Sequence, residues 1–123
     1  VKLLVQLHEG KILQPSHTRL LIGFMERSLP GWNRLRGNLP RGTVVADKTG
    51  SGEQDAVTKV AKATNDVGII TLPSGRGHLA MAVLVSESTL PDAAQEKLIA
   101  ELARAAYDAY STDPAKRAAD FHR

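Results

Sequence analysis

The stretch Val44-Val45-Ala46-Asp47-Lys48-Thr49-Gly50-Ser51-Gly52 is the segment around which the rest of this 123-residue chain is organised. Its two leading valines favour a β-strand, because β-branched side chains fit a pleated surface. The residues after Asp47 place an ammonium group, a hydroxyl group and an accessible length of backbone at the end of that strand. An anionic ligand can bind along such an edge. The tripeptide Lys-Thr-Gly alone also fits an ordinary strand that ends in a glycine-rich turn.

Two well-known phosphate-binding motifs do not fit this stretch. A P-loop has a glycine directly before its lysine, and here that position is Asp47. A dinucleotide-binding fingerprint has a third glycine after Gly50 and Gly52, and here that position is Asp55. The stretch is therefore not predicted to cradle a nucleotide phosphate through either motif.

Composition excludes several other classes of function. The chain has no cysteine, which rules out disulfides and zinc–thiolate sites. The net charge is +3 with acids and bases interspersed, so we expect no nucleic-acid partner. No apolar run is long enough to cross a bilayer, so we expect no membrane association. The four histidines lie far apart in the sequence without metal-ligand spacing, and we expect no metal site.

Hydrophobic periodicity predicts three helices and three strands. The first helix covers residues 1–9, and its pattern has no preceding cap, as expected for a chain cut from a longer one. A second helix, capped by Ser16, buries an apolar stripe of Leu20, Leu21, Phe24 and Met25. The strands are predicted at residues 43–49, 67–72 and 78–86, with a polar loop at 51–63 and a hairpin turn at 73–77.

The last helix is predicted to begin at Asp92 and to run to about Tyr110. Gln95 lies three residues after Asp92, the spacing of a capping box. A polar, alanine-rich tail at residues 111–123 is expected to fray. The residues expected to form the packing face of this helix are Leu98, Ile99, Leu102, Ala105, Ala106 and Ala109.

The wording and order of four separated segments resemble the C-terminal part of a class A serine β-lactamase. They are the run 32–42 before the strand, the Lys48-Thr49-Gly50 motif, the run 64–73 that begins Thr-Asn-Asp-Val-Gly-Ile-Ile, and the final helix after Pro91-Asp92. The resemblance extends from about Lys2 to about Tyr110. It implies an α+β fold, the C-terminal part of the β-lactamase/transpeptidase-like fold, with three antiparallel strands, a long C-terminal helix and N-terminal helices.

The resemblance also implies a division of the chain. Residues 1–31 would be helices from the all-α side of the enzyme, and residues 32–110 would be the C-terminal half of its α/β sheet domain. It implies no cofactor, and a periplasmic or secreted location.

The resemblance assigns roles to five residues. Lys48 would hold the substrate carboxylate electrostatically and influence the catalytic serine, and Thr49 and Gly50 would line the same site. The backbone N–H of Ser51 would be half of the oxyanion hole. Arg34 would reinforce carboxylate binding, because Val67 occupies the position from which other members supply an arginine. Arg36 is expected instead to pair with Asp47.

The residues that carry out the chemistry in this family are absent from this stretch of sequence. We find no Ser-x-x-Lys pair and no Ser-Asp-Asn motif. We therefore interpret the chain as one wall of an active site whose serine nucleophile lies on a missing N-terminal part, and expect the chain alone to be inactive. A penicillin-binding transpeptidase or carboxypeptidase relative, or an inactive truncated interaction domain, remains an alternative.

The apolar strand Leu79–Val85 would then have an open edge. We expect it to pair either with the N-terminal segment of the same enzyme or with a swapped second copy of the chain.

Overall fold

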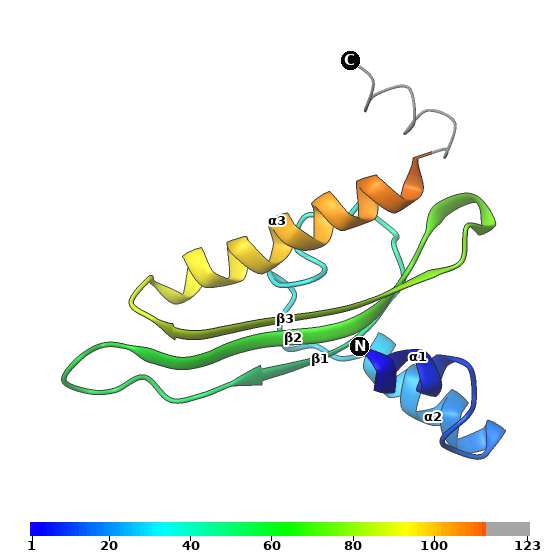
Figure 1. The fold of residues 1–123 in the computed structure, drawn as a ribbon, viewed down its shortest axis with the longest axis horizontal. Coiled ribbons are helices and arrows are strands. Elements are labelled where there is room, and N and C mark those ends of the chain that lie inside the picture. The colour runs from blue at the N-terminus through cyan, green and yellow to red at the C-terminus, as the bar shows by residue number, and fades with distance from the viewer. Residues whose placement is uncertain (113–123) are drawn as a thin grey trace.

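The computed structural model describes residues 1–112, apart from the side chain of Lys62. It contains helices α1 (Lys2–His8), α2 (Pro15–Glu26) and α3 (Asp92–Ser111). Its strands are β1 (Val45–Ser51), β2 (Ala61–Thr71) and β3 (His78–Ser88). Figure 1 shows α3 lying along one face of the sheet and α1 with α2 gathered at the opposite face. The tail predicted to fray falls largely at residues 113–123, outside the described residues.

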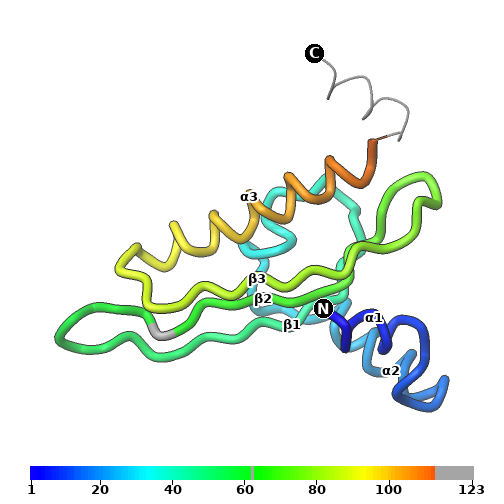
Figure 2. The backbone as a smooth tube through the Cα atoms, viewed as in Figure 1, coloured from blue at the N-terminus to red at the C-terminus, as the bar shows by residue number. Residues whose placement is uncertain are grey.

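The strands form one antiparallel sheet in the order β1-β2-β3. Val45 lies opposite Ile70, and Thr49 lies opposite Asp66, so the register is continuous along β1. The path of the backbone in Figure 2 makes clear that both connections are simple hairpins. The predicted α+β class and the three antiparallel strands are confirmed.

The strand boundaries differ from those predicted. β1 begins two residues late, and β2 begins at Ala61, six residues before the predicted start. The Gln54–Ala61 bridge extends pairing further into the loop. Residues 61–66 were missed because Lys62, Asn65 and Asp66 are polar, and cross-strand pairing overrides that weak local preference.

Two apolar clusters hold the layers together. Between the sheet and α3 the buried members are Leu35, Val45, Ile70, Leu72, Val83, Ile99, Ala103 and Tyr107. On the opposite face the buried members are Leu4, Leu7, Met25, Ala46 and Ile69. Because both faces of β1 contribute, the strand that carries the lysine motif is clamped from both sides at its start.

The predicted details of α2 are partly wrong. Its N-cap is Gln14, and Pro15 occupies the first turn, where its fixed φ suits the start of a helix. Met25 is buried as expected, but Leu20 and Phe24 are 53% and 59% exposed, and Leu21 is also exposed. Within residues 1–112 only Met25 of the predicted apolar stripe is buried, and the other three side chains stay exposed.

The capping box predicted for α3 is wrong. The N-cap is Pro91, without a side-chain capping bond. The Gln95 amide instead donates to the carbonyl of Leu90 at 2.7 Å.

The face that α3 buries also differs from the predicted one. Its buried residues are Gln95, Ile99, Ala100, Ala103 and Tyr107. Of the predicted set only Ile99 is buried, whereas Leu98 and Leu102 are exposed. Helical periodicity could not choose between two comparable apolar stripes, and the position of the sheet decides it.

β3 lies at an edge of the sheet. Within the described part of the chain its backbone pairs with β2 alone, as the sequence predicted for Leu79–Val85. One face of β3 packs toward α3 through Leu79, Met81, Val83 and Val85. On its other face Leu84 is 69% exposed, so cover there is incomplete.

Candidate active site

The lysine motif occupies the exposed end of β1. Val45, Ala46 and Asp47 are buried, whereas Lys48, Gly50 and Ser51 are exposed and Thr49 is half-buried. Alternation along the strand places Lys48 on the same face as Ala46, toward α1 and α2, and places Thr49 and Ser51 on the α3 face with Asp47. The Lys48 ammonium donates to the carbonyl of Thr49 at 2.6 Å. The strand thus buries its first half and leaves most of its second half exposed.

Arg34 reaches this end of β1 from the segment before it. Its side chain is almost buried and donates through Nη1 to the carbonyls of Gly50 at 3.1 Å and Asn65 at 2.9 Å. Its Nη2 donates to the Ser51 hydroxyl at 2.8 Å. Its Nε donates to the Glu96 carboxylate at 3.2 Å. The structure therefore brings Arg34 together with Gly50 and Ser51, and ties both strands to α3 through one guanidinium.

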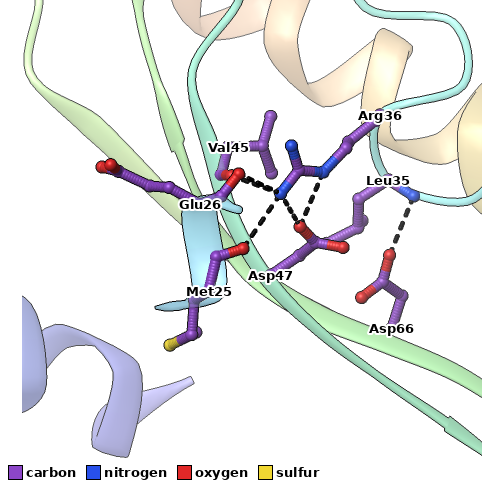
Figure 3. A network of polar contacts seen from close by, with 7 residues as sticks. All are labelled: Met25, Glu26, Leu35, Arg36, Val45, Asp47 and Asp66. Carbon is purple, nitrogen blue, oxygen red and sulfur yellow. Dashed lines mark hydrogen bonds and ion pairs between the residues drawn. The ribbon is translucent and has the colours of Figure 1, made fainter. Parts of the chain in front are cut away.

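Arg36 pairs with Asp47, as predicted. Its Nε donates to Asp47 Oδ1 at 2.7 Å, and its Nη2 contacts the same oxygen (Figure 3). Nη2 also donates to the carbonyls of Val45 at 2.7 Å and Met25 at 3.0 Å, so the guanidinium links the end of α2 to β1. Breaking a buried ion pair of this kind by removing one partner is strongly destabilising.

Asp66 organises the backbone beside the site. Its Oδ2 accepts a hydrogen bond from the Leu35 N–H at 3.1 Å. Neighbouring Asn65 accepts from the Val85 N–H at 3.1 Å and so joins β2 to β3. Burial raises the pKa of Asp66 to about 6, and the nearby Asp47 carboxylate adds to that shift. Burial also raises the pKa of Asp47, against the opposing effect of Arg36.

Gly31 gives the preceding segment its close approach to the motif. Its φ is +80°, in the left-handed region, and a Cβ there would lie 2.2 Å from the Thr49 Cγ2 methyl. A side chain at position 31 would therefore displace Thr49.

Sequence reasoning missed Glu96 and Gly31 as neighbours of the site. Glu96 lies 62 residues after Arg34, and in the sequence it is one acid among several on an amphipathic helix. Only the packing of α3 across the sheet brings its carboxylate to Arg34. The Pro30-Gly31 pair signals a turn, but its contact with Thr49 has no local signal.

The profile of the β-lactamase enzyme family matches residues 1–110. The chain belongs to this family. Its structure is similar to that of the TLA-1 extended-spectrum β-lactamase, with a TM-score of 0.87 and 41% identity, over 91% of this chain and 40% of that one. The TLA-3 extended-spectrum β-lactamase gives a TM-score of 0.88 at the same identity and the same coverage. Other solved neighbours are described as class A enzymes, among them one from Bacteroides cellulosilyticus at 30% identity and a TM-score of 0.86, over 92% of this chain and 40% of that one. The chain is thus a partial class A β-lactamase.

The curated proteins with similar sequences are also β-lactamases. β-Lactamase VEB-1 of Pseudomonas aeruginosa is 38% identical over 112 residues, which are 89% of this chain and 36% of that protein. The extended-spectrum β-lactamase PER-1 of the same organism is 43% identical over 95 residues, which are 77% of this chain and 30% of PER-1. The chain therefore spans about a third of the length of these relatives.

Within residues 1–112 no cluster of three His, Cys, Asp or Glu side chains is placed to bind a metal ion. In the same part of the chain no helix is long and apolar enough to span a bilayer.

Proposed function

We propose that this chain is the substrate-facing C-terminal part of a class A β-lactamase. The complete protein would hydrolyse β-lactam antibiotics through a serine acyl-enzyme, with the nucleophile on a segment outside this chain. The observation that carries the proposal is the outer end of β1, Lys48-Thr49-Gly50-Ser51, which follows a buried first half in a chain of this family.

The groups at this strand end suit an anionic substrate whose carbonyl carbon is attacked by a nucleophile. The Lys48 ammonium and the Thr49 hydroxyl are a point charge and a hydrogen-bonding group for the substrate carboxylate. The Ser51 N–H would donate to the oxygen on which charge develops, and losing one such donor typically costs about 3–4 kcal/mol. Gly50 leaves room for the substrate to lie against the backbone.

Arg34 would support this site mainly by holding the strand end in place. Its three nitrogens already donate to Gly50, Asn65, Ser51 and Glu96. Its positive charge lies beside the Ser51 hydroxyl and adds to the field of Lys48. We therefore propose a smaller contribution to carboxylate binding from Arg34 than from Lys48.

The proposed partner of the chain is the N-terminal remainder of the same enzyme. It would pair with the free edge of β3 and cover Leu84, Leu20 and Phe24, which are exposed here. In this arrangement residues 1–31 pack with the all-α side, and residues 32–110 complete the sheet domain. The proposed location is periplasmic or secreted.

The alternative of a penicillin-binding transpeptidase receives less support. The similar proteins described above are named β-lactamases, with 38% and 43% identity to VEB-1 and PER-1. This favours hydrolysis over peptide transfer by the complete protein.

A chimera tests the proposal. The matched C-terminal span of VEB-1 is replaced by residues 1–112 of this chain, and hydrolysis of a chromogenic cephalosporin is measured. We expect turnover by the chimera, a large loss on Lys48→Ala, and no turnover by the isolated chain.

Three results would contradict it. One is a folded chimera that binds but does not hydrolyse the substrate. Another is a chimera whose kcat/KM is unchanged by Lys48→Ala. Turnover that co-purifies with the isolated chain would show that the nucleophile is not outside it.

A further inference from the structure

Two buried carboxyl groups lie side by side beneath the segment that precedes β1. Thr49 is the partner of Asp66 and Gly68 is the partner of Asp47, so the two aspartates lie diagonally on the same face of neighbouring strands. Both residues are 0% exposed. Figure 3 shows one oxygen of each carboxyl pointing toward the other carboxyl.

Each aspartate has one satisfied oxygen and one without a partner. Asp47 Oδ1 is bonded to Arg36, and Asp66 Oδ2 accepts from the Leu35 N–H. The buried oxygens left over, Asp47 Oδ2 and Asp66 Oδ1, have no hydrogen-bond partner. Two ionised carboxylates in this position would leave both oxygens unsatisfied and repel each other.

The backbone at Gly68 lies close to both Asp47 and Leu35. A Cβ on Gly68 would lie 3.0 Å from the Asp47 Cβ and 3.1 Å from Leu35 Cδ1, and Leu35 itself is fully buried. The neighbourhood of Asp47 is therefore tightly packed on the side of Gly68. A protonated carboxyl supplies a donor from within the pair itself.

The positively charged side chains near the two aspartates already have defined contacts. Arg36 neutralises Asp47 through Oδ1, and Arg34 is turned to Ser51, the strand carbonyls and Glu96 of α3. Lys48 points to the other face of β1. Two carboxylates with one directly bonded guanidinium thus carry an excess negative charge, which one bound proton removes.

We propose that Asp47 and Asp66 share one proton in the folded chain, with Asp66 Oδ1–H donating to Asp47 Oδ2. This O–H···O bond links β1 to β2 directly beneath Leu35, between Arg34 and Arg36. It makes the strand end that carries Lys48 sensitive to pH. Deprotonation releases the proton to solvent and leaves two carboxylates in contact.

The direction of the pH dependence follows from the raised pKa of Asp66. Its pKa lies near 4 in an unfolded chain and at about 6 in the folded one, so folding takes up a proton between these values. The stabilisation is complete below about pH 4 and is lost as the pH rises through about 6. Because the pair titrates as a unit, the folded chain is expected to release one proton over this range.

The substitution Asp66→Asn tests the shared proton. The amide keeps an acceptor for the Leu35 N–H and supplies a permanent N–H donor to Asp47 Oδ2. Unfolding of the full 123-residue chain in urea is measured from pH 4 to pH 7 for wild type, Asp66→Asn and Asp66→Leu. Asp55→Asn is the matched control, because Asp55 is exposed and its pKa is lowered by the Thr58 donors and the Val57 N–H.

We expect the folding equilibrium constant of the wild type to fall, relative to Asp66→Asn, by roughly tenfold per pH unit between pH 4 and pH 6. Asp66→Leu is expected to be less stable than Asp66→Asn at every pH, because it orphans the Leu35 N–H and Asp47 Oδ2. Asp55→Asn should retain the pH-dependent contribution to stability that the Asp47–Asp66 pair makes in the wild type. A second readout is infrared absorption of a protonated carboxyl group at pH 5.5, present in the folded wild type and absent from Asp66→Asn.

Parallel pH profiles for wild type and Asp66→Asn would overturn the proposal. So would the absence of a protonated-carboxyl band at pH 5.5, or a loss of stability in Asp66→Asn equal to that in Asp66→Leu. None of these measurements uses enzyme activity, so they stand independently of the proposed β-lactam hydrolysis.

Discussion

Gly31→Ala separates steric contact with the site from backbone strain. Gly31 has a φ of +80°, and its new Cβ would meet Thr49 Cγ2 at 2.2 Å. Gly42 has a φ of +87° with nothing within 4 Å of its Cβ position, so Gly42→Ala is a matched control. Both variants place an alanine in the left-handed region, which costs about 1–2 kcal/mol. Only Gly31→Ala must also move Thr49.

The extra loss for Gly31→Ala is expected to be about 1–3 kcal/mol, the usual cost of overpacking a filled site. Urea unfolding of the chain measures it as a shift of the midpoint at constant slope. Thr49→Ser removes the Cγ2 methyl, so the double variant Gly31→Ala/Thr49→Ser should recover most of the extra loss. In the chimera with VEB-1, Gly31→Ala should also reduce kcat/KM, because Thr49 is forced away from its position beside Lys48.

Equal losses for Gly31→Ala and Gly42→Ala would refute this reasoning, since they would show that Thr49 is not in the way. Failure of Thr49→Ser to rescue the double variant would refute it in a second way. If both glycine variants are as stable as the wild type, the left-handed conformations themselves are wrong.

Three further predictions concern the strand and its supports. In the chimera, Lys48→Ala should lower kcat/KM far more than Arg34→Ala, compared as free energies, and equal or inverted losses would show that the two roles are misassigned. Arg36→Leu should destabilise the chain by about 3–5 kcal/mol, because it leaves the buried Asp47 carboxylate without its cation. Lys97→Ala breaks an exposed pair with Glu101 and should cost less than about 1 kcal/mol. Similar losses of stability for the two variants in urea unfolding would contradict this. The isolated chain should associate as its concentration increases in analytical ultracentrifugation. Leu84→Lys on β3 should weaken this association more than Leu102→Lys on α3. A wild-type chain that stays monomeric would count against a β3 edge that is free to pair.

The family and the order of the elements could be predicted from the residues alone. The valines before Asp47 and the glycines after Thr49 specify a strand and its end through local sterics, and the Pro73–Gly77 turn specifies a hairpin. The pairing of Arg36 with Asp47 was also predictable, because the pleat turns the Asp47 side chain away from Lys48. These features depend on neighbours in sequence or on a resemblance carried by several motifs.

The groups that surround the site were set by tertiary packing. The face that α3 buries depends on where the sheet lies, so Ala103 and Tyr107 are buried while Leu98 and Leu102 are not. Glu96 meets Arg34 across 62 residues of chain, and Asp47 meets Asp66 only through the register of β1 on β2. The sequence around each of these residues does not indicate such contacts. Packing of the helix and the strands brings the residues together in space, and their separation along the chain does not reveal how close they lie in the fold.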